Sequence, residues 1–269
     1  ILKGHTGCSQ SEDEPCVTSS SLNSSMFAQL HDIIILLTQR DSNDVVSLES
    51  DDPIDETDIE PEATLSCMNL SGATLTDAHL SDADFSGADV SDADLSGANL
   101  YNSDFTDATL TDADLTDATL GNADLSDADL RDTTFCDADL SDANLSNTAL
   151  WYADLSDADL SDANLFSATL FDANLTSADL SNVSLWEADL TTADLTDATL
   201  TQYQDQDEDE IDFFLGIKYA DLTDVTLTSA DLSDTSLNGV DFSDANLTNV
   251  NLSGASLNEV DFSDANLTN

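Results

Sequence analysis

Basic residues are nearly absent from this chain of 269 residues, which has 4 lysines and arginines against 57 aspartates and glutamates and a formal net charge of -53. Recognition of nucleic-acid phosphates depends on Lys and Arg, so we expect no direct binding to nucleic acid. No run of about 18 apolar residues occurs, and a membrane-spanning helix is therefore not expected. The first residues, Ile1-Leu2-Lys3, do not begin the apolar segment of a secretory signal.

Residue patterns that support catalysis are also scarce. The three histidines, His5, His31 and His79, are far apart in the sequence, and no nucleophile elbow, phosphate-binding loop or zinc-binding spacing occurs. Carboxylates are abundant, but catalytic pairs need burial to separate their pKa values. We therefore expect neither an enzyme nor a bound cofactor, and only diffuse binding of K⁺ or Na⁺ along the carboxylates.

What the chain does contain is a strict five-residue period. Every fifth residue from Leu65 to Leu200 is Leu, Phe or Val, within a frame of Ala-(Asp/Asn)-Leu-(Ser/Thr)-X. A helix would spread these apolar residues over all its faces, and a flat strand would alternate them between two faces. A chain that turns a corner once every five residues instead sends one large and one small side chain inward at each step.

This frame, as in Ala113 to Asp117, resembles the repeat of the pentapeptide-repeat proteins, and the resemblance extends from Ala63 to Asn269. It implies an all-β solenoid, a right-handed quadrilateral β-helix with about 20 residues per coil and coils stacked at roughly 4.8 Å. The central Leu or Phe of each repeat and the Ala two residues before it would point inward. Inward phenylalanines twenty residues apart are expected to stack as ordinary core packing; the inward phenylalanines are Phe85, Phe105, Phe135, Phe242 and Phe262.

Two segments are expected before the solenoid. Residues 1–21 are predicted to be a flexible acidic tail, and residues 22–62 an α-helix over 22–40 followed by an acidic linker. The apolar residues of this helix favour a lid over the first coil, because solenoids need capped ends. A helix that contacts a partner or a second copy is the alternative.

The solenoid, residues 63–269, has one predicted interruption, a loop at about 201–216. The next central residue is due at position 205 and instead appears at Ile217, so twelve additional residues leave the repeat. Ten clear central positions then follow, from Leu222 to Leu267.

Outward positions twenty residues apart lie above one another in such a rod, and large side chains gather in two of these columns. Arg131, Trp151 and Phe171 form one column, with Tyr152 beside Trp151. A second column, on the adjoining side, contains Phe166 and Trp186. An exposed aromatic cluster usually marks a contact surface, so a docking site for a partner or a second copy is one interpretation. In the other, three aromatic residues of the loop fold back over the cluster: Tyr203, Phe213 and Phe214.

The acidity itself predicts an environment. Carboxylates on successive coils would lie about 5 Å apart, and each like pair costs roughly 0.8 kcal/mol at the dielectric constant of water. Summed over many pairs, this exceeds a typical net stability of about 5–15 kcal/mol, and molar salt removes most of it by screening. The excess of Asp on every side and in the tails is similar to that in the proteins of salt-accumulating halophiles. We therefore expect salt adaptation and a location in a salt-rich cytoplasm, in preference to an extracellular or lipid-anchored one.

The family resemblance implies an alternative explanation of the charge. Some pentapeptide-repeat proteins are similar in shape to B-DNA and bind type II topoisomerases such as DNA gyrase, as inhibitors or protectors, and some need a surface loop for protection. Two features argue against this role here. The charge is expected to be nearly uniform around the rod, and the repeat stops at Leu267-Thr268-Asn269, where the DNA-mimicking members usually carry a dimerising segment.

We therefore expect a non-enzymatic protein-binding or structural scaffold from a halophile, with a DNA-mimicking topoisomerase inhibitor or protector as the alternative. The partner would be an unknown protein bound at the aromatic columns, a type II topoisomerase, or a second copy that associates through the open C-terminal coil. A fold alone does not decide among these functions.

Overall fold

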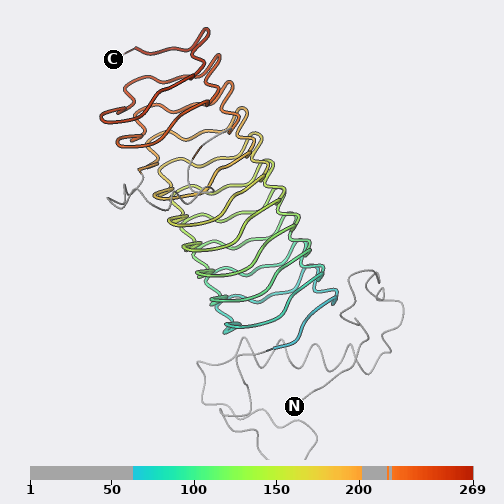
Figure 1. Cartoon of the computed structure of the whole chain (residues 1–269). Helices are drawn as coiled ribbons and strands as arrows, with labels where there is room; N and C mark the ends of the chain where they lie inside the picture. The colour runs from blue at the N-terminus through green and yellow to red at the C-terminus, as the bar shows by residue number, and fades with distance from the viewer. Residues whose placement is uncertain (1–62, 202–216, 218–219, 269) are drawn as a thin grey trace, which may run out of the picture.

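The computed structural model describes residues 63–201, 217 and 220–268, which form a rod of stacked coils (Figure 1). Isolated parallel β-bridges join residues twenty apart, for example Asp124 with Asn144 and Asn144 with Asn164, and one bridge occurs in every five residues. Four bridges in each twenty residues define four sides per coil. Within the described ranges the backbone contains these bridges and turns in place of longer strands or helices. The tail, helix and linker predicted for residues 1–62 lie outside the described residues.

The four sides are named by their first central residues: side A begins with Leu65, side B with Leu70, side C with Leu75 and side D with Leu80. The residue before each central residue is the bridge position, and the two residues after it are the first and second turn positions. The residue two before the centre, usually Ala, is the corner position. Each side recurs every twenty residues as far as Leu200.

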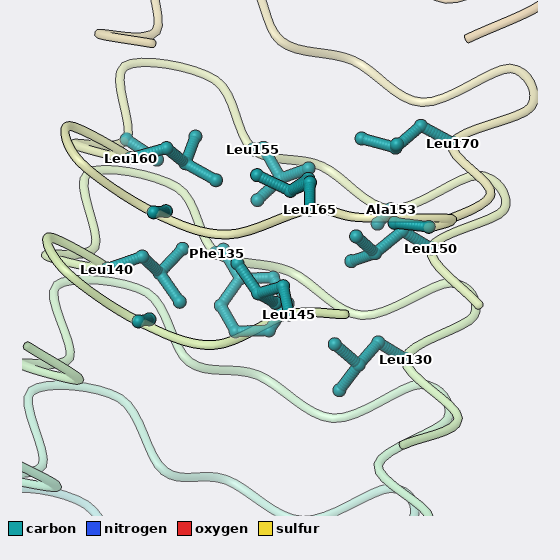
Figure 2. Packing of buried hydrophobic residues seen from close by; sticks show 14 of the residues in the cluster. Leu130, Phe135, Leu140, Leu145, Leu150, Ala153, Leu155, Leu160, Leu165 and Leu170 are labelled. Carbon is teal, nitrogen blue, oxygen red and sulfur yellow. The ribbon is translucent and has the colours of Figure 1, made fainter. Parts of the chain in front are cut away.

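The core is one continuous column of central and corner side chains. Nearly all of them are fully buried, and Figure 2 shows Leu130, Leu150 and Leu170 of side B one above another, pointing into the rod. On side A the rings of Phe85 and Phe105 stack with centroids 4.5 Å apart and planes 6° from parallel. On side B, Phe242 and Phe262 stack with centroids 5.6 Å apart. Phe135 is buried on side C without an adjacent phenylalanine in its column. Each coil thus buries its apolar groups against its neighbours, as solenoids do.

Among the described repeats, polar residues occupy corner positions only where a backbone carbonyl accepts their hydroxyl hydrogen. Ser103 Oγ donates to the Leu100 carbonyl at 2.7 Å, and Thr148 Oγ1 donates to the Leu145 carbonyl at 2.7 Å. Thr133 Oγ1 reaches the Leu110 carbonyl of the previous coil at 2.8 Å. A buried hydroxyl without such a partner would lower the stability, so these bonds explain why Ala can be replaced here.

Hydrogen bonds of the side chain at the bridge position explain why Asp or Asn is preferred there and why Ser or Thr is preferred two residues later. Asp154 Oδ1 accepts hydrogen bonds from the backbone N–H of Ser156 at 3.1 Å and from its hydroxyl at 2.7 Å. The same arrangement recurs along the rod and closes an Asx turn, for which Asp and Asn are equally suited. Asn174 Nδ2 also donates to Asp154 Oδ1 at 2.9 Å, linking one coil to the next.

The second turn position has a left-handed backbone in every described repeat, with φ between 54° and 80°. A positive φ at the third residue of a four-residue turn is the feature of a type II turn, and Asp, Asn and Gly tolerate it best. This requirement supplies a second reason for the abundance of Asp. The turn leads directly into the next corner, as in the bond from the Ala128 N–H to the Leu125 carbonyl at 3.1 Å.

Two glycines at the second turn position allow the cost of the left-handed backbone to be measured apart from the cost of a steric collision. Gly72 and Gly97 have φ of 66° and 67°; a Cβ on Gly72 would meet nothing within 4 Å, whereas one on Gly97 would collide with Asp77 Oδ1. We expect Gly72→Ala to lower the free energy of unfolding by about 1 kcal/mol, from the left-handed backbone alone. Gly97→Ala should cost about 1 kcal/mol more, because the Asp77 carboxylate must move. Urea unfolding measures both, and equal losses would contradict the predicted role of Asp77.

The register continues across residues 202–216 with an offset. Asp189 bridges Asp221 and Thr199 bridges Asp231, each 32 residues apart, twelve more than in an ordinary coil. Side A therefore continues at Ile217, which is buried, and side B at Leu222. The columns of the four sides are thus continuous over the whole described rod.

Candidate interaction surface

The large outward side chains gather on neighbouring columns of sides A and B. Trp151 and Phe171 occupy first turn positions of side B, and Tyr152 occupies the second turn position beside Trp151. Phe166 and Trp186 occupy first turn positions of side A, at the corner that leads into side B. We call these five residues the aromatic patch. Their columns are set by the buried leucines before them, among which Leu150 and Leu170 are seen in Figure 2.

Contacts between successive coils hold the side B part of the patch. The indole Nε1 of Trp151 donates a hydrogen bond to Thr169 Oγ1 in the next coil at 2.7 Å. The rings of Tyr152 and Phe171 meet edge to face, with centroids 6.0 Å apart and planes at 86°. Trp151 is still 42% exposed and Tyr152 54% exposed, so these rings are fixed in place and remain open to solvent. Phe166, Phe171 and Trp186 are half-buried.

The bridge positions beneath the patch lack carboxylates. Along side B this column reads Asp129, Ala149, Thr169 and Asp189, so two successive coils have a small neutral residue where the repeat usually has Asp or Asn. Thr169 supplies the acceptor for Trp151. We call these two successive neutral bridge positions, Ala149 and Thr169, the neutral window; Asn69 and Thr109 are further neutral positions of the same column.

Arg131 lies at the N-terminal edge of this window. It is the single Lys or Arg among the residues that the structure describes. Its Nε and an Nη donate to Asp129 at 2.7 and 2.6 Å, and this bonding lowers the pKa of the Asp129 carboxyl. Because the Arg131 side chain is 45% exposed, solvent screens the ion pair and its contribution to stability is small. Its main effect is to neutralise the carboxylate next to the aromatic residues.

Tyr152 has a backbone conformation that is costly for its residue type. Its φ is 61°, in a position where the other repeats mostly place Asp, Asn or Gly. A bulky residue in this region costs about 1–2 kcal/mol. Retained strain of this kind is a reason to ask whether the side chain has a function.

The structure describes six of the nine contact residues predicted from the sequence, namely Arg131 and the aromatic patch. It places them in neighbouring columns and brings Tyr152 and Phe171 into contact. That they bind a partner stays a prediction. Tyr203, Phe213 and Phe214 lie outside the described residues, so covering of the patch by the predicted loop stays a prediction. Sequence reasoning missed Tyr101 on side D, which is 49% exposed. Its hydroxyl accepts a hydrogen bond from Asn122 Nδ2 at 3.0 Å, and its ring lies against Gly121 in the next coil. A glycine twenty residues after an exposed aromatic residue was the available signal.

The charge is less uniform than the sequence predicted. In the last described coils, residues 217–268, six of the nine carboxylates lie on side B and none lies on side C. Asp231 and Asp234 lie on side D, and Glu259 lies on side A. The expectation of a nearly isotropic charge is therefore wrong for this end of the rod. The six side B residues form two parallel columns, which are Asp221, Asp241 and Asp261 and Asp224, Asp244 and Asp264.

Other types of site are not found in the described part of the chain. No group of three or more His, Cys, Asp or Glu side chains there has the arrangement of a metal site. Among the same residues, no helix has the length and apolar character needed to cross a bilayer. In the final coil Leu257 and Leu267 are 41% and 52% exposed, and self-association through this coil stays a prediction.

A four-sided solenoid with Asx turns and an outward aromatic patch defines the class of protein, a repeat scaffold. The sequence profile of pentapeptide repeats matches residues 62–92, 93–132, 138–176, 168–202, 218–244 and 245–269. The chain belongs to the pentapeptide-repeat family, whose fold is a right-handed quadrilateral β-helix. None of the curated proteins matches the chain.

Solved structures of the same family are similar to the chain. HetL, a pentapeptide repeat protein involved in heterocyst differentiation regulation from the cyanobacterium Nostoc sp. strain PCC 7120, is 32% identical, with 74% of this chain and 89% of HetL covered and a TM-score of 0.35. QnrB1, a plasmid-mediated fluoroquinolone resistance protein, is 17% identical, with 74% and 92% covered and a TM-score of 0.46. A pentapeptide repeat protein of the Arabidopsis thaliana thylakoid lumen is 32% identical, with 46% and 72% covered and a TM-score of 0.17.

Proposed function

We propose that this chain is a non-enzymatic scaffold that binds a partner protein through the aromatic patch. The observation that carries this proposal is the exposure of Trp151 and Tyr152, which are held by inter-coil contacts on a neutral window of an otherwise polar, acidic surface. Exposed aromatic clusters with polar surroundings are typical of protein interfaces. The acidity of the remaining surface is, in this proposal, an adaptation to a salt-rich cytoplasm.

Removal of the two tryptophans tests the proposal. The double variant Trp151→Ser with Trp186→Ser places at both first turn positions a residue that is common there, since most repeats have Ser or Thr at this position, so the fold should persist. We expect the immobilised variant to lose the proteins that the wild-type chain captures from a lysate of its source, because interface energy is concentrated in a few large aromatic residues. Mass spectrometry of the captured proteins provides the measurement.

Tyr101→Ser is the matched control, because Tyr101 has a similar exposure on side D. This variant should capture the same proteins as the wild type. Equal capture by the double variant and the wild type, with both showing the same circular dichroism spectrum, would contradict binding through the patch.

A second candidate function is binding to a type II topoisomerase such as DNA gyrase. The asymmetric charge favours it, because a DNA mimic needs its carboxylates on the docking side, and side B has two columns of aspartates over three coils. The family resemblance supplies the precedent, because some pentapeptide-repeat proteins bind these enzymes. Electrostatic complementarity of this kind mainly sets the association rate and the specificity.

Gyrase supercoiling assays test this candidate in salt that keeps the rod folded. We expect inhibition at micromolar protein, and a loss of inhibition in Asp241→Asn with Asp244→Asn. Asn occupies both kinds of position in other repeats, as at Asn246 and Asn249, so these changes remove charge without removing a turn residue. Unchanged supercoiling with the wild-type protein would exclude inhibition of gyrase.

A further inference from the structure

We infer that the occupant of the aromatic patch is a basic segment of the partner protein, with an Arg or Lys side chain placed against Trp151 and Tyr152 and between the carboxylates of Asp132 and Asp172. This inference rests on the proposed function and specifies its partner. The shape and charge of the surface around Tyr152 support it.

Tyr152 stands between two carboxylates in one column. Asp132, Tyr152 and Asp172 are second turn positions of side B in three successive coils, which are spaced by roughly 4.8 Å. The Asp132 N–H donates to the Trp151 carbonyl at 3.0 Å and the Tyr152 N–H to the Phe171 carbonyl at 3.0 Å, so the backbone fixes this order. Both carboxylates are exposed.

Trp151 presents its ring and not its donor. The indole N–H is already bonded to Thr169 Oγ1 at 2.7 Å, so a ligand meets the π surface and the carbon edge of the ring. An aromatic face attracts a cation through its quadrupole, most strongly for Trp and for Arg. A neutral or anionic ligand would gain no such attraction, and an anionic one would be repelled by Asp132 and Asp172.

The cations of the rod itself do not occupy this position. Among the described residues, the single ion pair joins Arg131 to Asp129, where both guanidinium bonds are directed. Asp172 has no hydrogen bond from a basic side chain of the described rod. The Arg131 charge is also attracted by the neighbouring Asp132, so Asp172 is the carboxylate next to Tyr152 that is most open to a cation supplied by a partner.

The charge of the whole chain selects the same partner chemistry. A formal net charge of -53 creates a potential that accelerates association with basic proteins and slows association with acidic ones. Charge alone, however, attracts a basic segment to every side of the rod. The aromatic patch is the feature that would hold the segment at one place.

Tryptophan fluorescence tests the inference, because the chain has two tryptophans. In a Trp186→Phe background Trp151 is the single emitter. The probe is a short peptide in which arginine alternates with glycine and serine, and a peptide with glutamate in place of arginine is the control. We expect the arginine peptide to change the emission of Trp151 in a saturable manner, and the glutamate peptide to leave it unchanged.

Two pairs of charge-neutralising variants then separate the local contact from general attraction. Asp132→Asn with Asp172→Asn should weaken binding of the arginine peptide about fivefold or more. Asp137→Asn with Asp157→Asn removes the same charge from second turn positions of side C, and it should weaken binding by less than about twofold. Asn is found at this turn position in other repeats, such as Asn122 and Asn147, so both pairs should fold.

Equal weakening by the two pairs would overturn the inference, because it would leave only non-specific attraction to the rod. Binding of the glutamate peptide, or no change in Trp151 emission with the arginine peptide, would overturn it as well. If the peptides fail while the tryptophan variant still loses captured proteins, the partner is not basic but the patch remains a docking surface. If both fail, the proposed function is wrong too.

Discussion

Transfer from molar potassium chloride to about 0.1 M should lower the melting temperature of the rod by about twenty degrees or more, because the Debye length rises from about 3 Å to about 10 Å. Unscreened carboxylates then repel one another along each column. Some bridge-position columns contain only aspartate over three coils, as in Asp139, Asp159 and Asp179 on side D. Circular dichroism melts at several salt concentrations measure the effect.

A melting temperature that is high and independent of salt would contradict salt adaptation. The acidity would then need another explanation, and the topoisomerase assay would become the next experiment.

Two single substitutions in one coil locate this repulsion. Asp159 lies between Asp139 and Asp179, whereas Asp154 lies between Thr134 and Asn174. Asp159→Asn should raise the stability at low salt by about 1–2 kcal/mol, since it removes two like-charge contacts and offers a hydrogen-bond donor to Asp139. Asp154→Asn removes the same charge and should have a much smaller effect. An equal gain from both substitutions would show that net charge, and not the column, determines the stability.

Truncation of a stacked core ring should have the second large effect. Phe105→Ala should lower the free energy of unfolding by about 3–5 kcal/mol, because it removes a fully buried ring from its stack on Phe85 and leaves a cavity. Phe105→Leu restores the usual central residue and should cost about 1–2 kcal/mol. Urea unfolding followed by circular dichroism distinguishes the two.

A small loss from Phe105→Ala would mean that neighbouring coils collapse into the space. The core would then repack around a removed side chain more readily than the close stacking of Phe85 and Phe105 indicates.

The sequence predicts the core of this protein well, because a strict period leaves one arrangement in which every leucine is buried. The spacing alone places Phe105 over Phe85, and it places Trp151 and Phe171 in one column. The same spacing of five and twenty residues predicts that side A resumes at Ile217 and side B at Leu222. These predictions need no knowledge of side-chain conformation, since the repeat fixes the position of each residue.

The rest depends on interactions that the period does not determine. The bond from Trp151 to Thr169 requires a particular rotamer and a threonine in the next coil. The neutral window arises from Ala149 and Thr169, which in the sequence look like ordinary variation of the repeat. The asymmetry of charge near the C-terminal end becomes visible only when each carboxylate beyond the offset is assigned to its side. The helix predicted over 22–40 stays a prediction.

The offset of 32 residues between Asp189 and Asp221 leaves the sides of the rod in register, and a length change within the repeat itself would have a different effect. Most repeats have Leu at the centre and Ala at the corner, so loss or gain of a single five-residue unit away from the stacked phenylalanines would preserve most of the packing. It would nevertheless turn everything beyond it by a quarter of a revolution. After such an event before Asp221, the aspartates of side B would face another direction relative to Trp151. Gain or loss of one five-residue unit therefore moves every later residue to the adjoining side of the rod. New combinations of surface residues can arise in this way without any substitution.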